Sequence, residues 1–268
     1  MILCSLLKQS DPIPGSQESA WQLVEESQQH PARPVVLIPQ PSHAVLAGDL
    51  AQALLPEAFG ELPANIIRAI RMHDSGWGTL DAAQIHKARA GANDEIKRGV
   101  EIPLLSFLRI PSAEAVSAWK ASVDEADKIA PECGFIVSRH FSLLSVRGDR
   151  SHAAFAKNEA VRRERIIRSS KASPADLERW TDALGFCDLL SLYLCGYSCT
   201  GISVSASMPR VHPARRSDTP ALEIHRTGDH VTLSQPLVRP GTRVEIHGLM
   251  HPAPEIGSAA VALGWTFD

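Results

Sequence analysis

The feature that most constrains the fold is a long, almost entirely apolar helical pattern in the last third of the chain. Ser173, Pro174 and Asp176 predict the start of this helix, because they supply a capping residue, a proline in the first turn and an acid near the positive end of the helix dipole. From Leu184 the pattern reads LGFCDLLSLYLCGYSC and is apolar nearly all the way round. Such a helix is stable when other helices surround it, so we expect a helical bundle built around this segment.

Asp188 is the acidic residue that interrupts this apolar pattern. A carboxylate buried on such a helix costs several kcal/mol unless a cation, a metal ion or several hydrogen-bond donors meet it. Two interpretations follow from the sequence. Asp188 either binds a metal ion or forms a buried ion pair with an arginine.

A second polar pair, His73 and Asp74, stands at the end of an amphipathic helix predicted from about Ala64. The surrounding stretch reads IIRAIRMHDSGWGTLD, so an imidazole and a carboxylate lie side by side where the helix gives way to a glycine-containing turn. These two groups together suit borderline or hard divalent cations. The alternative is a solvated pair at a helix end, which needs no ligand.

Two further histidines interrupt apolar helical patterns. Ser42 is the expected N-cap of a helix over residues 43–55, which places His43 in the first turn. His140 lies among apolar residues in FIVSRHFSLLSV, a predicted helix over residues 135–146. His140 is either a ligand or a hydrogen-bonded residue of the core.

Strand-like patterns are confined to the two ends of the chain. Residues 1–7 and 34–39 are predicted to form short strands. After the helical region, LEIH, HVTLS and TRVEIHG alternate apolar and polar residues and are also predicted to be strands. A hairpin is expected across Arg226–Asp229. Between the helices, residues 75–111 are rich in Gly, Asp, Lys and Arg and predict a long irregular excursion with at most short helices.

These patterns predict a single domain of mainly α fold, residues 1–268. Its helical core would cover about residues 40–206, with N-terminal strands in residues 1–39 and a C-terminal β segment in residues 210–268 packed on it. The two terminal segments would form a small antiparallel β-sheet.

Composition limits the class of protein. The chain is 44% hydrophobic and carries a formal charge of −3, which excludes a dominant polyanion-binding role, so no nucleic acid polymer is expected as a partner. No apolar run approaches the roughly 20 residues of a membrane helix, and the start MILCSLLKQSDPIPG lacks the basic region of a signal peptide. Five cysteines without zinc-ribbon spacing indicate reduced thiols, and we expect a cytoplasmic protein without a membrane partner.

The polar residues that interrupt the predicted apolar helices are His43, His73 with Asp74, His140 and Asp188. The order of a histidine, an HD pair and a distant aspartate on a late helix resembles the HD superfamily of metal-dependent phosphohydrolases. The strings QPSHAVLAGDLA, IRMHDSGW, SRHFSLL and CDLLSLYL are in addition similar to the DUF3891 family, bacterial proteins of unknown function with an HD-like fold. This second resemblance covers roughly residues 35–197.

The resemblance implies an HD-like helical bundle that holds a divalent metal ion, which could be iron, manganese, zinc, nickel or magnesium. The metal ligands that it implies are His43, His73, Asp74 and Asp188. His140 corresponds to the additional histidine that some HD enzymes use for a second metal or for the substrate phosphate. Trp77 stands where a lysine often follows the HD turn in the hydrolases, so their activity cannot simply be transferred.

The implied chemistry is metal-assisted hydrolysis of a phosphate ester, with nucleotides among the candidate substrates. The candidate catalytic residues are Asp74, which could orient the water, and Asp81 and His140, which could transfer protons. The candidate substrate-binding residues are Arg71, Lys87 and Arg139 for charge stabilisation and Trp77, which could stack on a base or simply pack. The expected partner is a small phosphorylated molecule, and a homodimer is compatible with the sequence.

Other classes of function are left open by the sequence. An HD-like protein can instead use iron for oxygen chemistry, or bind a metabolite as a sensor without turnover. A serine hydrolase is suggested by Gly196 to Gly201, but the spacing misses G-x-S-x-G by one residue and the required order of strand and helix is absent. Cys187, Cys195 and Cys199 could form a thiolate site, or they could be small apolar residues of a buried helix.

Overall fold

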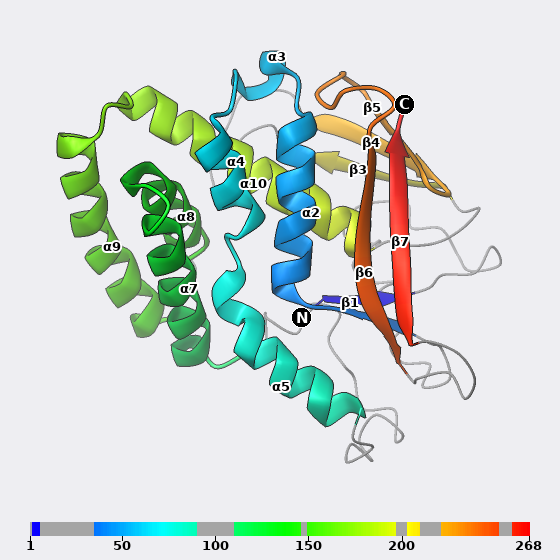
Figure 1. The fold of residues 1–268 in the computed structure, drawn as a ribbon, viewed down its shortest axis with the longest axis horizontal. Coiled ribbons are helices and arrows are strands. Elements are labelled where there is room, and N and C mark those ends of the chain that lie inside the picture. The colour runs from blue at the N-terminus through cyan, green and yellow to red at the C-terminus, as the bar shows by residue number, and fades with distance from the viewer. Residues whose placement is uncertain are drawn as a thin grey trace.

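The computed structural model describes residues 2–5, 35–89, 110–145, 149–196, 203–209, 221–251 and 259–268. The described residues form a layer of helices packed against a layer of strands, as Figure 1 shows. In the described part of the chain, no helix combines the length and the apolar character that a membrane crossing requires.

The helices, in chain order, are α2 (Gln40–Ala53), α3 (Pro56–Phe59), α4 (Ala64–Arg71), a 3-10 helix η1 (Ser75–Trp77), α5 (Gly78–Arg89), α7 (Ser112–Asp127), α8 (Pro131–Leu144), α9 (Arg150–Ser169) and α10 (Pro174–Gly196). Helix α10 is the central one, because it contacts α2, α3, α4 and α8 as well as strand β1. The apolar pattern from Leu184 explains this position, since Leu184, Phe186, Leu190 and Leu194 are all fully buried.

The strands are β1 (Ile2–Ser5), β2 (Val35–Ile38), β3 (Ser203–Met208), β4 (Leu222–Thr227), β5 (His230–Leu233), β6 (Arg243–His251) and β7 (Ala260–Phe267). They form a seven-stranded sheet in the order β1-β2-β6-β7-β5-β4-β3. Neighbouring strands are antiparallel except β5 and β7, which pair in parallel. Thr227 pairs with His230, which confirms the predicted hairpin.

The predicted fold class is therefore wrong. Instead of a mainly α, HD-like bundle with a small antiparallel sheet from the two terminal segments, the chain forms a mixed α/β structure with a mixed seven-stranded sheet as a full layer. Helices α2 and α10 lie between this sheet and the outer helices α7, α8 and α9 (Figure 1). Both central helices are apolar around most of their surface, so each contacts helices on one side and strands on the other.

Two local predictions also differ from the structure. Helix α2 begins at Gln40 after Pro39, so Ser42 is a helical residue and not the N-cap. The stretch predicted to be irregular contains α5, a helix of 12 residues, while residues 90–109 lie outside the described part of the chain. Residues 197–201 of the suggested serine hydrolase motif also lie outside it.

Candidate metal centre

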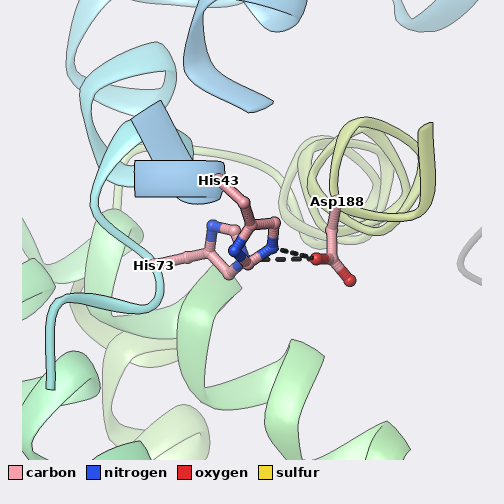
Figure 2. A group of neighbouring side chains, drawn as sticks. All are labelled: His43, His73 and Asp188. Atoms are coloured by element: carbon pink, nitrogen blue, oxygen red, sulfur yellow. Dashed lines mark hydrogen bonds and ion pairs between the residues drawn. The ribbon is translucent and has the colours of Figure 1, made fainter. Parts of the chain in front are cut away.

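Three elements distant in sequence bring His43, His73 and Asp188 together. His43 lies in the first turn of α2, His73 follows the end of α4, and Asp188 lies midway along α10. One ligand atom from each residue lies within 4.8 Å of the other two, and all three residues are buried. Figure 2 shows the two imidazole rings converging on the Asp188 carboxylate.

The hydrogen bonds of the two rings fix which nitrogen faces the cluster. The Nδ1 atom of His43 lies 2.7 Å from the Gln40 carbonyl oxygen, and that of His73 lies 2.8 Å from the Ile70 carbonyl oxygen. A carbonyl oxygen only accepts, so both Nδ1 atoms carry a proton. In each neutral ring the Nε2 atom then has a free lone pair, and it is Nε2 that faces Asp188.

Both lone pairs point at the same oxygen atom. Asp188 Oδ1 lies 2.9 Å from His43 Nε2 and 3.4 Å from His73 Nε2. The Nε2 atom of His73 is buried and has no hydrogen-bond partner among the described residues. Three electron-rich atoms in a dry site repel one another unless a proton or a metal cation lies between them.

The donor set suits a divalent metal ion as that cation. Two imidazole nitrogens and a carboxylate oxygen are common ligands of zinc, iron, manganese and nickel. Metal-binding histidines usually donate their second ring N–H to a carbonyl or carboxylate, which is the role of the Gln40 and Ile70 carbonyls here. The residues present therefore fit a bound metal ion.

Asp74 and His140 border this group. Asp74 Oδ2 lies 3.7 Å from His73 Nε2 and 3.6 Å from His43 Nδ1. His140 Nε2 lies 3.8 Å from the second oxygen of Asp188, and the His140 ring centre lies 5.5 Å from that of His73. Both residues are buried. The five polar residues singled out in the sequence thus lie in one place.

The charges of these groups depend on one another. Burial alone lowers the pKa of His73, but the charge of Asp74 and the Asp188 carboxylate outweigh burial and raise this pKa to about 9. Burial raises the pKa of Asp74, and the two histidines oppose the shift only in part. Burial also acts to raise the pKa of Asp188, yet the nearby imidazoles hold it well below its usual range. Asp188 is therefore the permanent negative charge, and Asp74 is better suited to exchange a proton.

The match to known families covers this site. The family described as "Protein of unknown function (DUF3891)" matches residues 27–231. The chain belongs to the DUF3891 family. No curated protein and no solved structure is significantly similar to the chain. The matched region contains all helices from α2 to α10, so all the residues of the cluster are part of the DUF3891 region.

Two of the three cationic residues expected to bind substrate form ion pairs in the DUF3891 structure. Arg71 forms an ion pair with Asp49 at 2.6 Å, and Arg139 forms one with Glu178 at 3.1 Å. All four side chains are about one-third exposed. Lys87 belongs to α5, and its side chain lies outside the described part.

Two other candidate residues are buried beside the cluster. Trp77 is 3% exposed and packs in the hydrophobic core. Asp81 is fully buried on α5, where it accepts a hydrogen bond from the backbone N–H of Gln40. The buried cysteines Cys187 and Cys195 lie on α10, and burial raises the pKa of Cys187, so its thiol is kept protonated.

Sequence reasoning missed Gln40 and misjudged the role of Gly76. Gln40 is 2% exposed and is tied to the site through its backbone, a role that the residue type does not reveal. The sequence placed Gly76 in a turn after the HD pair, whereas it lies in the 3-10 helix η1. In the structure a Cβ atom there would lie 2.1 Å from the Ala118 carbonyl oxygen, so close packing of η1 on α7 requires glycine. The Gly76 N–H donates to Ser122 Oγ at 3.0 Å in the same contact.

Proposed function

We propose that this DUF3891 protein binds a divalent metal ion through His43, His73 and Asp188 and uses it to hydrolyse a small phosphate ester. The observation that carries the proposal is the pair of Nε2 atoms directed at one oxygen of Asp188, with both Nδ1 protons held by backbone carbonyls. Asp74, which borders both rings, is the fourth ligand in this proposal.

The similarity to HD phosphohydrolases that we propose is limited to the residues of the metal site. Its support is the order of the ligands along the chain, a histidine, the His73–Asp74 pair and a late aspartate, together with their convergence on one point. The seven-stranded mixed sheet gives no support to a shared overall fold. The proposal therefore rests on the chemistry of the ligands and not on architecture.

Each group in the cluster has a separate role in the proposed hydrolysis. A bound divalent ion would lower the pKa of a water molecule and polarise a phosphoryl oxygen. Asp74, whose pKa burial raises, is suited to take a proton from this water. His140, beside the second oxygen of Asp188, is suited to return a proton to the leaving group.

A non-hydrolytic metal protein is the second candidate, either an iron-dependent oxygenase or a metabolite sensor. One observation favours it. The guanidinium groups of Arg71 and Arg139 are both paired with carboxylates, which compete with a phosphate for these cations.

Metal content and turnover test the two parts of the proposal separately. Protein purified without chelator or nickel resin should contain a divalent metal by elemental analysis, and His73→Ala and Asp188→Asn should both lose it. Asp176→Asn, a carboxylate change in the first turn of the same helix, should retain it. Full metal content in the first two variants would contradict the metal site.

Turnover is then measured with the metal-loaded protein. A screen of phosphomonoesters, phosphodiesters and nucleotides with manganese, iron, cobalt, nickel and magnesium should identify a hydrolysed substrate. Tight metal binding without any turnover would favour the sensor, and oxygen consumption with the iron-loaded protein would favour the oxygenase.

A further inference from the structure

Asp81 connects two helices at the edge of the metal cluster. It lies in the first turn of α5 and is fully buried, and its Oδ2 atom lies 2.5 Å from the backbone nitrogen of Gln40. The starts of α5 and α2 are packed together there, since a Cβ atom at Gly78 would lie in ordinary contact with Pro41, 3.8 Å from its Cγ. A buried carboxylate in this place needs strong donors.

The first turn of α2 has no cap of its own. Pro39 precedes the helix and provides no side-chain hydrogen bond, and Pro41 has no N–H to donate. The N–H groups of Ser42 and His43 donate to the Pro39 carbonyl oxygen at 3.0 and 3.2 Å. The N–H of Gln40 is therefore the one that needs an acceptor from outside the helix, and Asp81 supplies it with a charge that favours the helix N-terminus.

The same residue, Gln40, holds the ring of His43. Its carbonyl oxygen accepts the Nδ1 proton of His43 at 2.7 Å, while its N–H donates to Asp81. Asp81 thus binds the backbone N–H of Gln40, and His43 binds the carbonyl oxygen of the same residue. A shift of Gln40 would rotate the His43 ring and move its Nε2 atom away from Asp188.

We infer that Asp81 is a positioning residue, which fixes Gln40 so that His43 keeps its Nδ1 proton and turns Nε2 toward Asp188. The consequence for metal binding rests on the function proposed above, whereas the orientation of the ring does not. A simple helix cap would affect only stability. A positioning residue also controls the tautomer of His43 and the affinity of the site.

The first experiment follows the His43 ring by NMR in metal-free protein with isotopically labelled histidine. The His43 signal is the one that disappears in His43→Gln. In wild type the His43 Nδ1 proton, which is held by the Gln40 carbonyl oxygen, should exchange slowly with solvent. In Asp81→Ala the exchange should become fast or the tautomers should mix. An unchanged His43 signal in Asp81→Ala would overturn the inference.

A matched control separates positioning from capping. Asp149 accepts hydrogen bonds from Ser151 N and His152 N at the start of α9, a helix that contacts α7 and α8. Asp149→Ala thus removes a capping carboxylate away from the cluster and should leave the His43 signal unchanged. Asp81→Asn, whose amide oxygen can still accept from Gln40, should restore most of the wild-type signal. Failure of Asp81→Asn to restore it would contradict an acceptor role.

The second experiment measures binding of Co²⁺ alone by titration, followed through its visible absorption. Asp81→Ala should bind Co²⁺ about 10- to 100-fold more weakly than wild type, the usual effect of losing a group that orients a ligand. Asp149→Ala should bind with wild-type affinity. Equal affinity of Asp81→Ala and wild type would overturn the role in metal binding. Absence of binding to wild type would instead contradict the proposed function, and the NMR result would still decide the orientation of His43.

If Asp81→Ala does not fold, Asp81→Leu replaces it in both experiments. Leucine fills the space of the buried carboxylate and removes the acceptor, so the same changes in the His43 signal and in Co²⁺ affinity are expected. A folded Asp81→Leu protein with both properties unchanged would overturn the inference.

Discussion

The rings of His43 and His73 lie nearly perpendicular, with centres 5.3 Å apart and planes 81° apart, and each donates its Nδ1 proton to the carbonyl oxygen three residues earlier in the chain. Two different helices thus present the same nitrogen, Nε2, to one oxygen of Asp188. The repetition of this local arrangement makes a metal site the simplest physical account of the cluster.

Asp188→Asn should destabilise the metal-free protein. In the absence of metal the Asp188 carboxylate is the counter-ion of protonated His73, and removing one partner of a buried pair costs about 3 to 5 kcal/mol. Urea unfolding of chelator-treated protein near neutral pH measures the loss. Asp176→Asn is the control, and an Asp188→Asn variant as stable as wild type would show that Asp188 does not balance the histidines.

The stability of the metal-free protein should fall as the solution becomes alkaline. The pKa of His73 is raised from 6.5 to about 9, so protonated His73 contributes stability that is fully present below pH 6.5 and is lost as the pH rises through about 9. The effect is on the order of 3 kcal/mol. The free energy of unfolding of wild type should fall as the pH rises from 6.5 to about 9. The free energy of unfolding of His73→Ala should not show this fall. A flat wild-type profile would contradict the shift.

Metal affinity should show the opposite pH dependence. Binding displaces the proton from His73 Nε2, so the affinity for Co²⁺ should rise by about tenfold per pH unit below the pKa of His73. Titrations at several pH values measure this slope. An affinity independent of pH would mean that no histidine proton is released.

Gly76→Ala should be strongly destabilising. Its Cβ would lie 2.1 Å from the Ala118 carbonyl oxygen, so η1 and α7 would have to separate, at a cost of roughly 1 to 3 kcal/mol or more. Gly196→Ala is the matched control, because no atom of the described residues lies within 4 Å of a Cβ at that position. The midpoint temperature of thermal unfolding should fall for Gly76→Ala and stay unchanged for Gly196→Ala. Equal midpoints would show that the helix contact can adjust.

The sequence predicted the individual polar residues of the site better than the fold around them. Asp188 and His73 were recognisable because each interrupts an apolar helical pattern, and a buried polar group in such a pattern needs a reason. The central position of α10 followed from the same pattern.

The sheet was mispredicted because strand pairing is a long-range property. Alternation identified β4, β5 and β6 as strands, but no local signal shows that β5 pairs with β7 in parallel or that β2 lies next to β6. Helix α5 was missed for another reason. Its sequence GTLDAAQIHKAR places no repeating apolar stripe on one face. Its buried Asp81 accepts a hydrogen bond from the first residue of α2.

X-ray absorption spectroscopy of the metal-loaded protein tests the central claim most directly, because it reports which atoms surround the ion. The account predicts scattering from two imidazole rings together with carboxylate oxygen. A spectrum with sulfur ligands, or one with oxygen ligands and no imidazole, would place the ion elsewhere and contradict the proposed site.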